Sequence, residues 1–228
     1  MNKRMIRRRD ALGLMGGAGV ALAFGCGNSP TTPGGADSPV TGTNGSCVIT
    51  PTETVGPFPS LTDLFRSDVR EGKPGTLLTL KIKVVSVNNG CAGVAGANVE
   101  IWHVDAAGNY SQYGTQTGQT YLRGIQTTNI NGEVTFTTIY PGWYSGRATH
   151  IHVEVTINGS SVKVTQMAFP ETVNATVHTS GVYASRGTNP MSNAADGIFA
   201  DSLSAELVTP VGDAAGGYTA TFQVAVAV

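Results

Sequence analysis

Apolar and polar side chains alternate along several short stretches of the chain. In the first of them, threonine and lysine alternate with Leu78, Leu80, Ile82 and Val84. A period of two is typical of a β-strand that buries one face. Similar stretches predict further strands over residues 99–105, 133–139, 150–157, 162–168 and 218–228.

Turn residues separate these predicted strands. Asn158-Gly159 stands between two of them and predicts a β-hairpin, because this pair favours the left-handed backbone of a tight turn. No stretch has a long helical period, and residues 171–201 are polar and irregular. The pattern therefore predicts an all-β fold, an antiparallel β-sandwich with long irregular loops. We expect residues 218–228 to form the closing strand, with an exposed edge that allows pairing with another copy into a homo-oligomer.

The first 26 residues are expected to be an export signal. Residues 1–25 combine five basic side chains with one acidic side chain, for a net charge of +4, and end in an apolar run too short to span a membrane comfortably. Arg8-Arg9-Asp10 resembles a twin-arginine signal, which serves proteins exported in the folded state. An ordinary secretory signal is the alternative.

Cys26 stands where a bacterial lipoprotein carries its lipidated cysteine. A Gly/Ser/Thr/Pro-rich tract follows it directly, as a membrane-anchored protein requires of its tether. We therefore favour a lipid-anchored protein at the periplasmic or cell surface over simple secretion. The predicted division is a signal over residues 1–26, a flexible tether over 27–46 and a sandwich domain over 47–228.

The charge of the chain argues against nucleic-acid binding, and its two remaining cysteines indicate a disulfide. The whole chain carries −1 and residues 1–25 carry +4, so the remainder carries −5 and gives no basis for binding nucleic acid. Cys47 and Cys91 are the two cysteines left, and in an exported chain they predict a disulfide. A thiolate metal site is the alternative, but no ligand pattern surrounds either cysteine.

Candidate metal ligands gather in one predicted strand. His150 and His152 are two positions apart, so their imidazoles project from the same face, although such a pair also occurs by chance. Tyr144 follows a Pro-Gly turn and can fold back toward that face. We expect His103 to be a core histidine or to support the ligands without binding metal, and His178 to lie at the surface.

Three stretches carry a more specific signal: VEIWHVDAAGNYSQY, YLRGIQTTNINGEVTF and TTIYPGWYSGRATHIHVEV. Together they resemble the intradiol ring-cleavage dioxygenases, and most closely the exported relatives of the protocatechuate 3,4-dioxygenase β chain. The resemblance covers most of residues 47–199. It implies an Fe(III) cofactor whose ligands fall on Tyr110, Tyr144, His150 and His152.

The resemblance also implies roles for neighbouring residues. It places the active-site arginine at Arg147, although the chain reads R-A-T-H where family members often have R-P-x-H. It places a pocket-lining glutamine at Gln166, and we expect Trp143 to pack or to line the substrate mouth. Tyr144 would accept a catechol proton, and Arg147 would stabilise negative charge on the ring. The segment between Tyr110 and Tyr121 is expected to shape the pocket.

The implied reaction is cleavage of a catechol-type ring by O2 between its two hydroxyl-bearing carbons, which gives a cis,cis-muconate-type dicarboxylic acid. Two other readings remain. A cupin-like ferrous or zinc site also uses H-x-H, but it leaves Tyr110 and Tyr144 unexplained. A non-catalytic β-sandwich binding module on the cell surface is the second, since a fold alone does not determine function.

Overall fold

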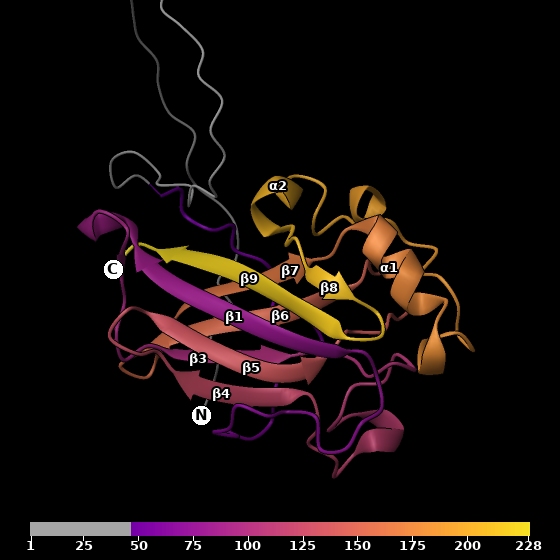
Figure 1. The fold of residues 1–228 in the computed structure, drawn as a ribbon. Helices are drawn as coiled ribbons and strands as arrows, with labels where there is room; N and C mark the ends of the chain where they lie inside the picture. Colours follow the sequence, from indigo (N-terminus) through magenta and orange to yellow (C-terminus); the bar gives the residue numbers. More distant parts are fainter. Residues whose placement is uncertain (1–46) are drawn as a thin grey trace, which may run out of the picture. The chain divides into compact units, whose positions relative to one another are not determined.

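The computed structural model describes residues 47–228, which form a sandwich of two β-sheets (Figure 1). The five-stranded sheet contains β1 (Leu77–Ser86), β2 (Ala92–Gly93), β5 (Glu133–Ile139), β8 (Val211–Asp213) and β9 (Gly217–Val226). The four-stranded sheet contains β3 (Asn98–Trp102), β4 (Arg123–Thr127), β6 (His150–Ile157) and β7 (Ser160–Ala168) in the order β4-β3-β6-β7. The expected β-sandwich is thereby confirmed.

The pairing of β9 differs from the expectation. In Figure 1, β9 and β1 run side by side, and they pair in parallel with Leu78 opposite Tyr218 and Ser86 opposite Val226. On its other side β9 pairs with β8 only along residues 217–219, and Thr50 bonds Ala225 near the other end, so the expected exposed edge is covered only in part. The other pairings within both sheets are antiparallel.

Alternating side chains of both sheets build one core between them. β1 contributes the four predicted residues, and Val134 and Phe136 of β5 lie beside them in the same cluster. The four-stranded sheet faces them with Val99, Ile101, Ile151, Val153 and Val155. β5 and β6 have the predicted bounds, and the predicted hairpin joins β6 to β7.

Short helices replace part of the loop expected over residues 171–201. α1 (Glu171–His178) and α2 (Leu203–Glu206) lie outside the two sheets (Figure 1), with 3-10 turns at Val87–Asn89, Gly114–Gln116, Gly181–Tyr183 and Asn193–Ala195. The surface position expected for His178 is wrong, because α1 packs against the Tyr140–Pro141 stretch and leaves His178 only 1% exposed.

Within residues 47–228, no helix combines the length and apolar character of a membrane span.

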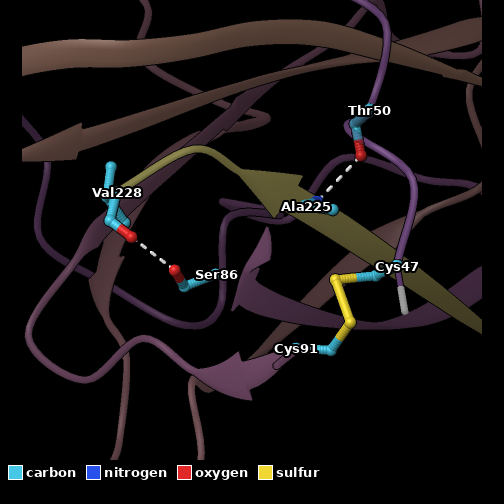
Figure 2. Close-up of a disulfide and its surroundings, with 6 residues drawn as sticks. All are labelled: Cys47, Thr50, Ser86, Cys91, Ala225 and Val228. Carbon is cyan, nitrogen blue, oxygen red and sulfur yellow. Dashed lines mark hydrogen bonds between the residues drawn. A yellow bond between two sulfur atoms is a disulfide. The ribbon is translucent and has the colours of Figure 1, made fainter. Parts of the chain in front are cut away.

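The N-terminal end of the described chain is fastened to the five-stranded sheet (Figure 2). The predicted disulfide is present and joins Cys47 to Cys91, with their Cα atoms 5.7 Å apart. Thr50 then exchanges hydrogen bonds with Ala225 of β9: its main-chain N–H donates over 3.1 Å, and its hydroxyl accepts over 2.8 Å. This attachment directs residues 51–60 across the four-stranded sheet, where Glu53 bonds the main chain of β7.

Candidate metal centre

The candidate site lies on the outer face of the four-stranded sheet, away from the sandwich core. Ile151 and Val153 of β6 point into the core, so the alternating residues His150 and His152 point to the opposite face. In the strand register, His152 lies between Trp102 of β3 and Gln166 of β7. The Trp102 ring stacks on the His152 ring, with centroids 4.8 Å apart and planes within 4°. The sheet itself thus fixes both imidazoles.

The four predicted ligands come together at this face. The Nε2 atoms of His150 and His152 are 3.2 Å apart, and the Tyr110 hydroxyl lies 3.4 Å from His150 Nε2. The Tyr144 ring lies 5.7 Å from both the His150 ring and the Tyr110 ring, measured between centroids. Two imidazoles and two phenols therefore converge, although Tyr110 lies 40 residues before His150 in the sequence.

The two imidazoles differ in how their Nδ1 atoms are held, and both are neutral. His150 Nδ1 lies 2.6 Å from the carbonyl oxygen of Ala148, a bond that requires the proton on Nδ1 and leaves a lone pair on Nε2. His152 Nδ1 is buried and has no hydrogen-bond partner. Burial lowers the pKa of His150 to about 3 and that of His152 well below its ordinary value, and nearby positive charge adds to both shifts. Both rings are consequently neutral, as metal ligands must be.

An Asp-centred turn positions Tyr110. The Asp105 carboxylate accepts hydrogen bonds from the main-chain N–H groups of Ala107 (3.0 Å) and Asn109 (2.9 Å). The same carboxylate forms an ion pair with Lys73 at 2.8 Å. β3 ends at Trp102, earlier than the strand expected over residues 99–105, and Asp105 opens the turn three residues later and holds it with its side chain.

Partly buried aromatic rings and a fully buried arginine surround Tyr110. Phe58 stacks on the Tyr110 ring at 4.8 Å and meets the Tyr144 ring edge-on at 6.1 Å. Arg123 is fully buried, and its guanidinium donates to Ser111 and to the carbonyl oxygen of Phe58. Its charge lies 5.7 Å from the centre of the Tyr110 ring. These contacts fix the Tyr110 ring from both sides.

A cavity of about 210 Å³ opens beside the two tyrosines. Its lining comes from the N-terminal segment and from the two tyrosine-bearing turns: Phe58, Gly108, Asn109, Tyr110, Tyr113, Gly114, Thr115, Gln116 and Tyr144. Four of these residues follow Tyr110, so the segment expected to shape the pocket does line this cavity.

Arg147 is held beside the ligands by two partners. Its Nε donates to Asp196 over 2.8 Å, and its Nη2 donates to the Gln166 side-chain oxygen over 2.6 Å. The Gln166 amide nitrogen donates in turn to the carbonyl oxygen of Thr54. Gln166 therefore orients Arg147 in this structure. Trp143 does not line the cavity, because its indole N–H bonds the Gly187 carbonyl and Arg186 covers its ring.

Both tyrosines are neutral phenols in these surroundings. Burial raises the pKa of the Tyr110 hydroxyl well above its ordinary value, and the Tyr144 hydroxyl adds to that shift. Burial also raises the pKa of Tyr144, while the Arg147 charge opposes the shift. A cation bound beside them would reverse this preference and favour the phenolate forms.

Comparison with known proteins identifies the family. A family model described as Dioxygenase matches residues 55–187, more than half of the chain. The chain belongs to the intradiol ring-cleavage dioxygenases. All the residues assigned above to the site fall within this match, except Thr54 and Asp196.

Solved intradiol dioxygenases share the architecture. An intradiol ring-cleavage dioxygenase from Tetranychus urticae is 28% identical, with a TM-score of 0.71 over 79% of this chain and 95% of that chain. The dioxygenase domain of a dioxygenase carbohydrate-binding protein fusion from Streptomyces sp. SirexAA-E is also 28% identical, with a TM-score of 0.62 over 79% and 99%. Catechol 1,2-dioxygenase from Pseudomonas arvilla C-1, at 19% identity and a TM-score of 0.56 over 78% and 62%, shares the fold.

Several residues of this dioxygenase site lacked a clear signal in the sequence. Phe58 and Asp196 reach the site from distant loops, and no local pattern relates them to β6. Arg123 had one weak signal, a lone arginine in an apolar stretch. His103 is not a ligand, because its two ring nitrogens bond Val104 and Thr138. Among residues 47–228, no group of three or more His, Cys, Asp or Glu side chains could hold a metal ion.

Proposed function

We propose that this protein is an Fe(III) dioxygenase that opens a catechol-type ring between its two hydroxyl-bearing carbons. O2 is the second substrate, and the product is a cis,cis-muconate-type dicarboxylic acid. The observation that carries the proposal is the convergence of two neutral imidazoles and two phenols on one face of the sheet. The ligands for the iron would be Tyr110, Tyr144, His150 and His152.

The donor set fits ferric iron. Adjacent ligand atoms around a metal with bonds of about 2.1 Å lie about 3 Å apart, and the two Nε2 atoms are separated by 3.2 Å. Imidazole suits iron among other transition metals. Phenolate oxygens are hard anionic donors, and two of them offset most of a trivalent charge. The fit thus favours the ferric over the ferrous ion.

The chain's own residues suggest how a catechol would be handled. The iron, when bound, would act as a Lewis acid toward the catechol oxygens. Tyr144 lies on an irregular turn and is partly exposed, so its phenolate oxygen can move and accept a catechol proton. His152 is fixed in β6 and keeps its position. Arg147, held by Asp196 and Gln166, would stabilise negative charge that develops on the ring.

The test is a visible absorption spectrum of the iron-loaded protein. Charge transfer from tyrosinate to ferric iron should give a broad visible band that changes when catechol is added. Tyr110→Phe should weaken this band strongly, because it removes one of the two phenolates. Oxygen consumption with catechol should fall by at least about 100-fold in the same variant.

Tyr113→Phe is the matched control. Tyr113 lines the same cavity but donates its hydroxyl proton to the Pro59 carbonyl, so the band should remain when this hydroxyl is removed. An iron-loaded wild-type protein without a visible band would contradict the proposal. In that case the non-catalytic binding module would become the better hypothesis.

We further propose that the protein is exported and lipid-anchored through Cys26. Residues 1–26 and the tether over 27–46 lie outside the described residues, so the proposal rests on the sequence. The Cys47–Cys91 disulfide supports the export part of the proposal, because structural disulfides persist in oxidising compartments. Cys26→Ser should move the protein from the membrane fraction to the soluble fraction of the cell envelope. Recovery of the unaltered protein in the soluble fraction would contradict anchoring.

A further inference from the structure

A short segment of the chain contacts both turns that carry the site's tyrosines. Arg186 Nη1 donates to the carbonyl oxygen of Ala107 over 3.0 Å, three residues before Tyr110. The same guanidinium lies 4.2 Å from the centre of the Trp143 ring, the residue before Tyr144. Arg186 therefore bridges the Tyr110 turn (residues 105–109) and the Tyr144 turn (residues 141–147).

The two turns also touch each other through their backbones. A Cβ atom on Gly108, which has a φ of +82°, would lie 2.2 Å from the Trp143 carbonyl oxygen. A Cβ atom on Gly142 would lie 2.3 Å from the Asp105 carbonyl oxygen. Only residues without a side chain permit this approach. The separation of the Tyr110 and Tyr144 rings consequently depends on how closely these turns are pressed together.

The segment that carries Arg186 is itself anchored. The main-chain N–H groups of Arg186 and Gly187 both donate to the Tyr183 carbonyl, and Tyr183 is a buried residue of the core. The Gly187 carbonyl accepts the Trp143 indole N–H over 2.8 Å, and the Asn189 amide donates to the Arg147 carbonyl over 2.9 Å. The bridge thus connects the two turns to the core and not only to each other.

We propose that Arg186 is a positioning residue, which holds the Tyr110 and Tyr144 turns at the separation that ferric iron requires. The inference rests on the proposed function. Arg186 is exposed and touches no ligand, so it acts through Ala107 and Trp143. Its role is preorganisation. Without the bridge, the two phenols would become ordered only when the metal binds, and the entropic cost of that ordering would lower the affinity for the metal.

The test compares Arg186→Gln with the wild-type full chain by two measurements. In the metal-free protein, amide hydrogen exchange should become faster in both turns, over residues 105–109 and 141–147. In the iron-loaded protein, a competing chelator should remove ferric iron about 10-fold more readily, as is typical when a residue supporting the ligands is lost. The tyrosinate charge-transfer band should shift or broaden as the ligand geometry loosens.

Two further variants sharpen the test. Arg186→Lys keeps a donor near Ala107 and a cation near Trp143, so it should restore most of the exchange protection and iron retention. Arg70→Gln removes a surface arginine whose partner is Asp68, and it should change neither measurement. A control that changes as much as Arg186→Gln would overturn the proposal, since the effect would then follow from any lost surface charge.

The outcomes separate this inference from the proposed function. Suppose that the wild type shows the charge-transfer band, and that Arg186→Gln has the same amide hydrogen exchange and the same iron retention as the wild type. The positioning role is then refuted and the proposed function stands. If the wild type binds no ferric iron, the proposed function fails. Exchange in the metal-free protein then still decides whether Arg186 holds the two turns together.

Discussion

His103 shows how burial determines the chemistry of a single side chain. It lies between the sheets, with Nδ1 2.8 Å from the Val104 carbonyl oxygen and Nε2 2.7 Å from the Thr138 hydroxyl. Burial lowers its pKa to about 4, although the nearby Asp105 charge opposes the shift. The neutral ring is therefore part of the folded state, and a proton on it favours unfolding.

This shift predicts a pH-dependent stability. The unfolded histidine binds a proton near pH 6.5 and the folded one near pH 4, so the stabilisation is complete above pH 6.5 and is lost as the pH falls toward about 4. Over that pH range, the free energy of unfolding of the wild type should fall by roughly 3 kcal/mol more than that of His103→Gln. Urea unfolding at pH 7.5, 6 and 4.5 measures the difference. Parallel pH curves for the two proteins would show that His103 is not the cause.

Residues with a local sequence pattern were predictable, and residues that reach the site from afar were not. His150 and His152 share a strand face, so their joint orientation follows from alternation alone. The resemblance supplied Tyr110, Tyr144 and Arg147; both tyrosines lie beside His150, and Arg147 bonds Gln166, the strand neighbour of His152. Asp196, in contrast, binds Arg147 across 49 residues of sequence, and only the tertiary fold brings the two together.

At the level of elements, strands with a buried face were predicted best. β5 and β6 have the expected bounds because valine, isoleucine and phenylalanine alternate with polar residues there. β4 was missed because its short run, Arg123–Thr127, has no alternation of its own and includes a buried arginine. α1 was missed because its sequence, ETVNATVH, is rich in threonine, valine and asparagine, which are weak helix formers. Tertiary packing, and not the local sequence, therefore determines that β4 and α1 form.

The disulfide cross-links the N-terminal segment to the turn after β1, and its removal should lower the stability of the fold. It closes a loop of 44 residues between the N-terminal segment and the turn after β1. The chain-entropy model assigns such a cross-link about 4 kcal/mol of the free energy of unfolding. Replacing Cys47 and Cys91 together by serine should therefore lower the midpoint of denaturant unfolding. Reduced wild-type protein should match the double variant, and an unchanged midpoint in both would contradict the prediction.

On the scale of the whole molecule, the site and the core use opposite faces of one sheet. Val153 packs between the sheets, while His152 next to it faces the candidate metal centre. The outer face is covered by residues 54–60 and by the two tyrosine turns, which form a separate small cluster around Trp102. The predicted ligands can therefore be altered without opening the main core, and the Tyr110→Phe variant proposed above should remain folded.

The parallel pairing of β1 with β9 has a consequence for the order of events during synthesis. β1 leaves the ribosome long before its neighbour, and the Ser86 hydroxyl finally bonds a main-chain oxygen 142 residues later in the chain. Until Gly217–Val226 has been translated, one side of β1 has no partner in its own sheet. Contacts this distant in sequence slow folding, and an incomplete sheet edge is prone to aggregation. The edge of β1 that pairs with β9 therefore stays open while residues 87–216 are translated.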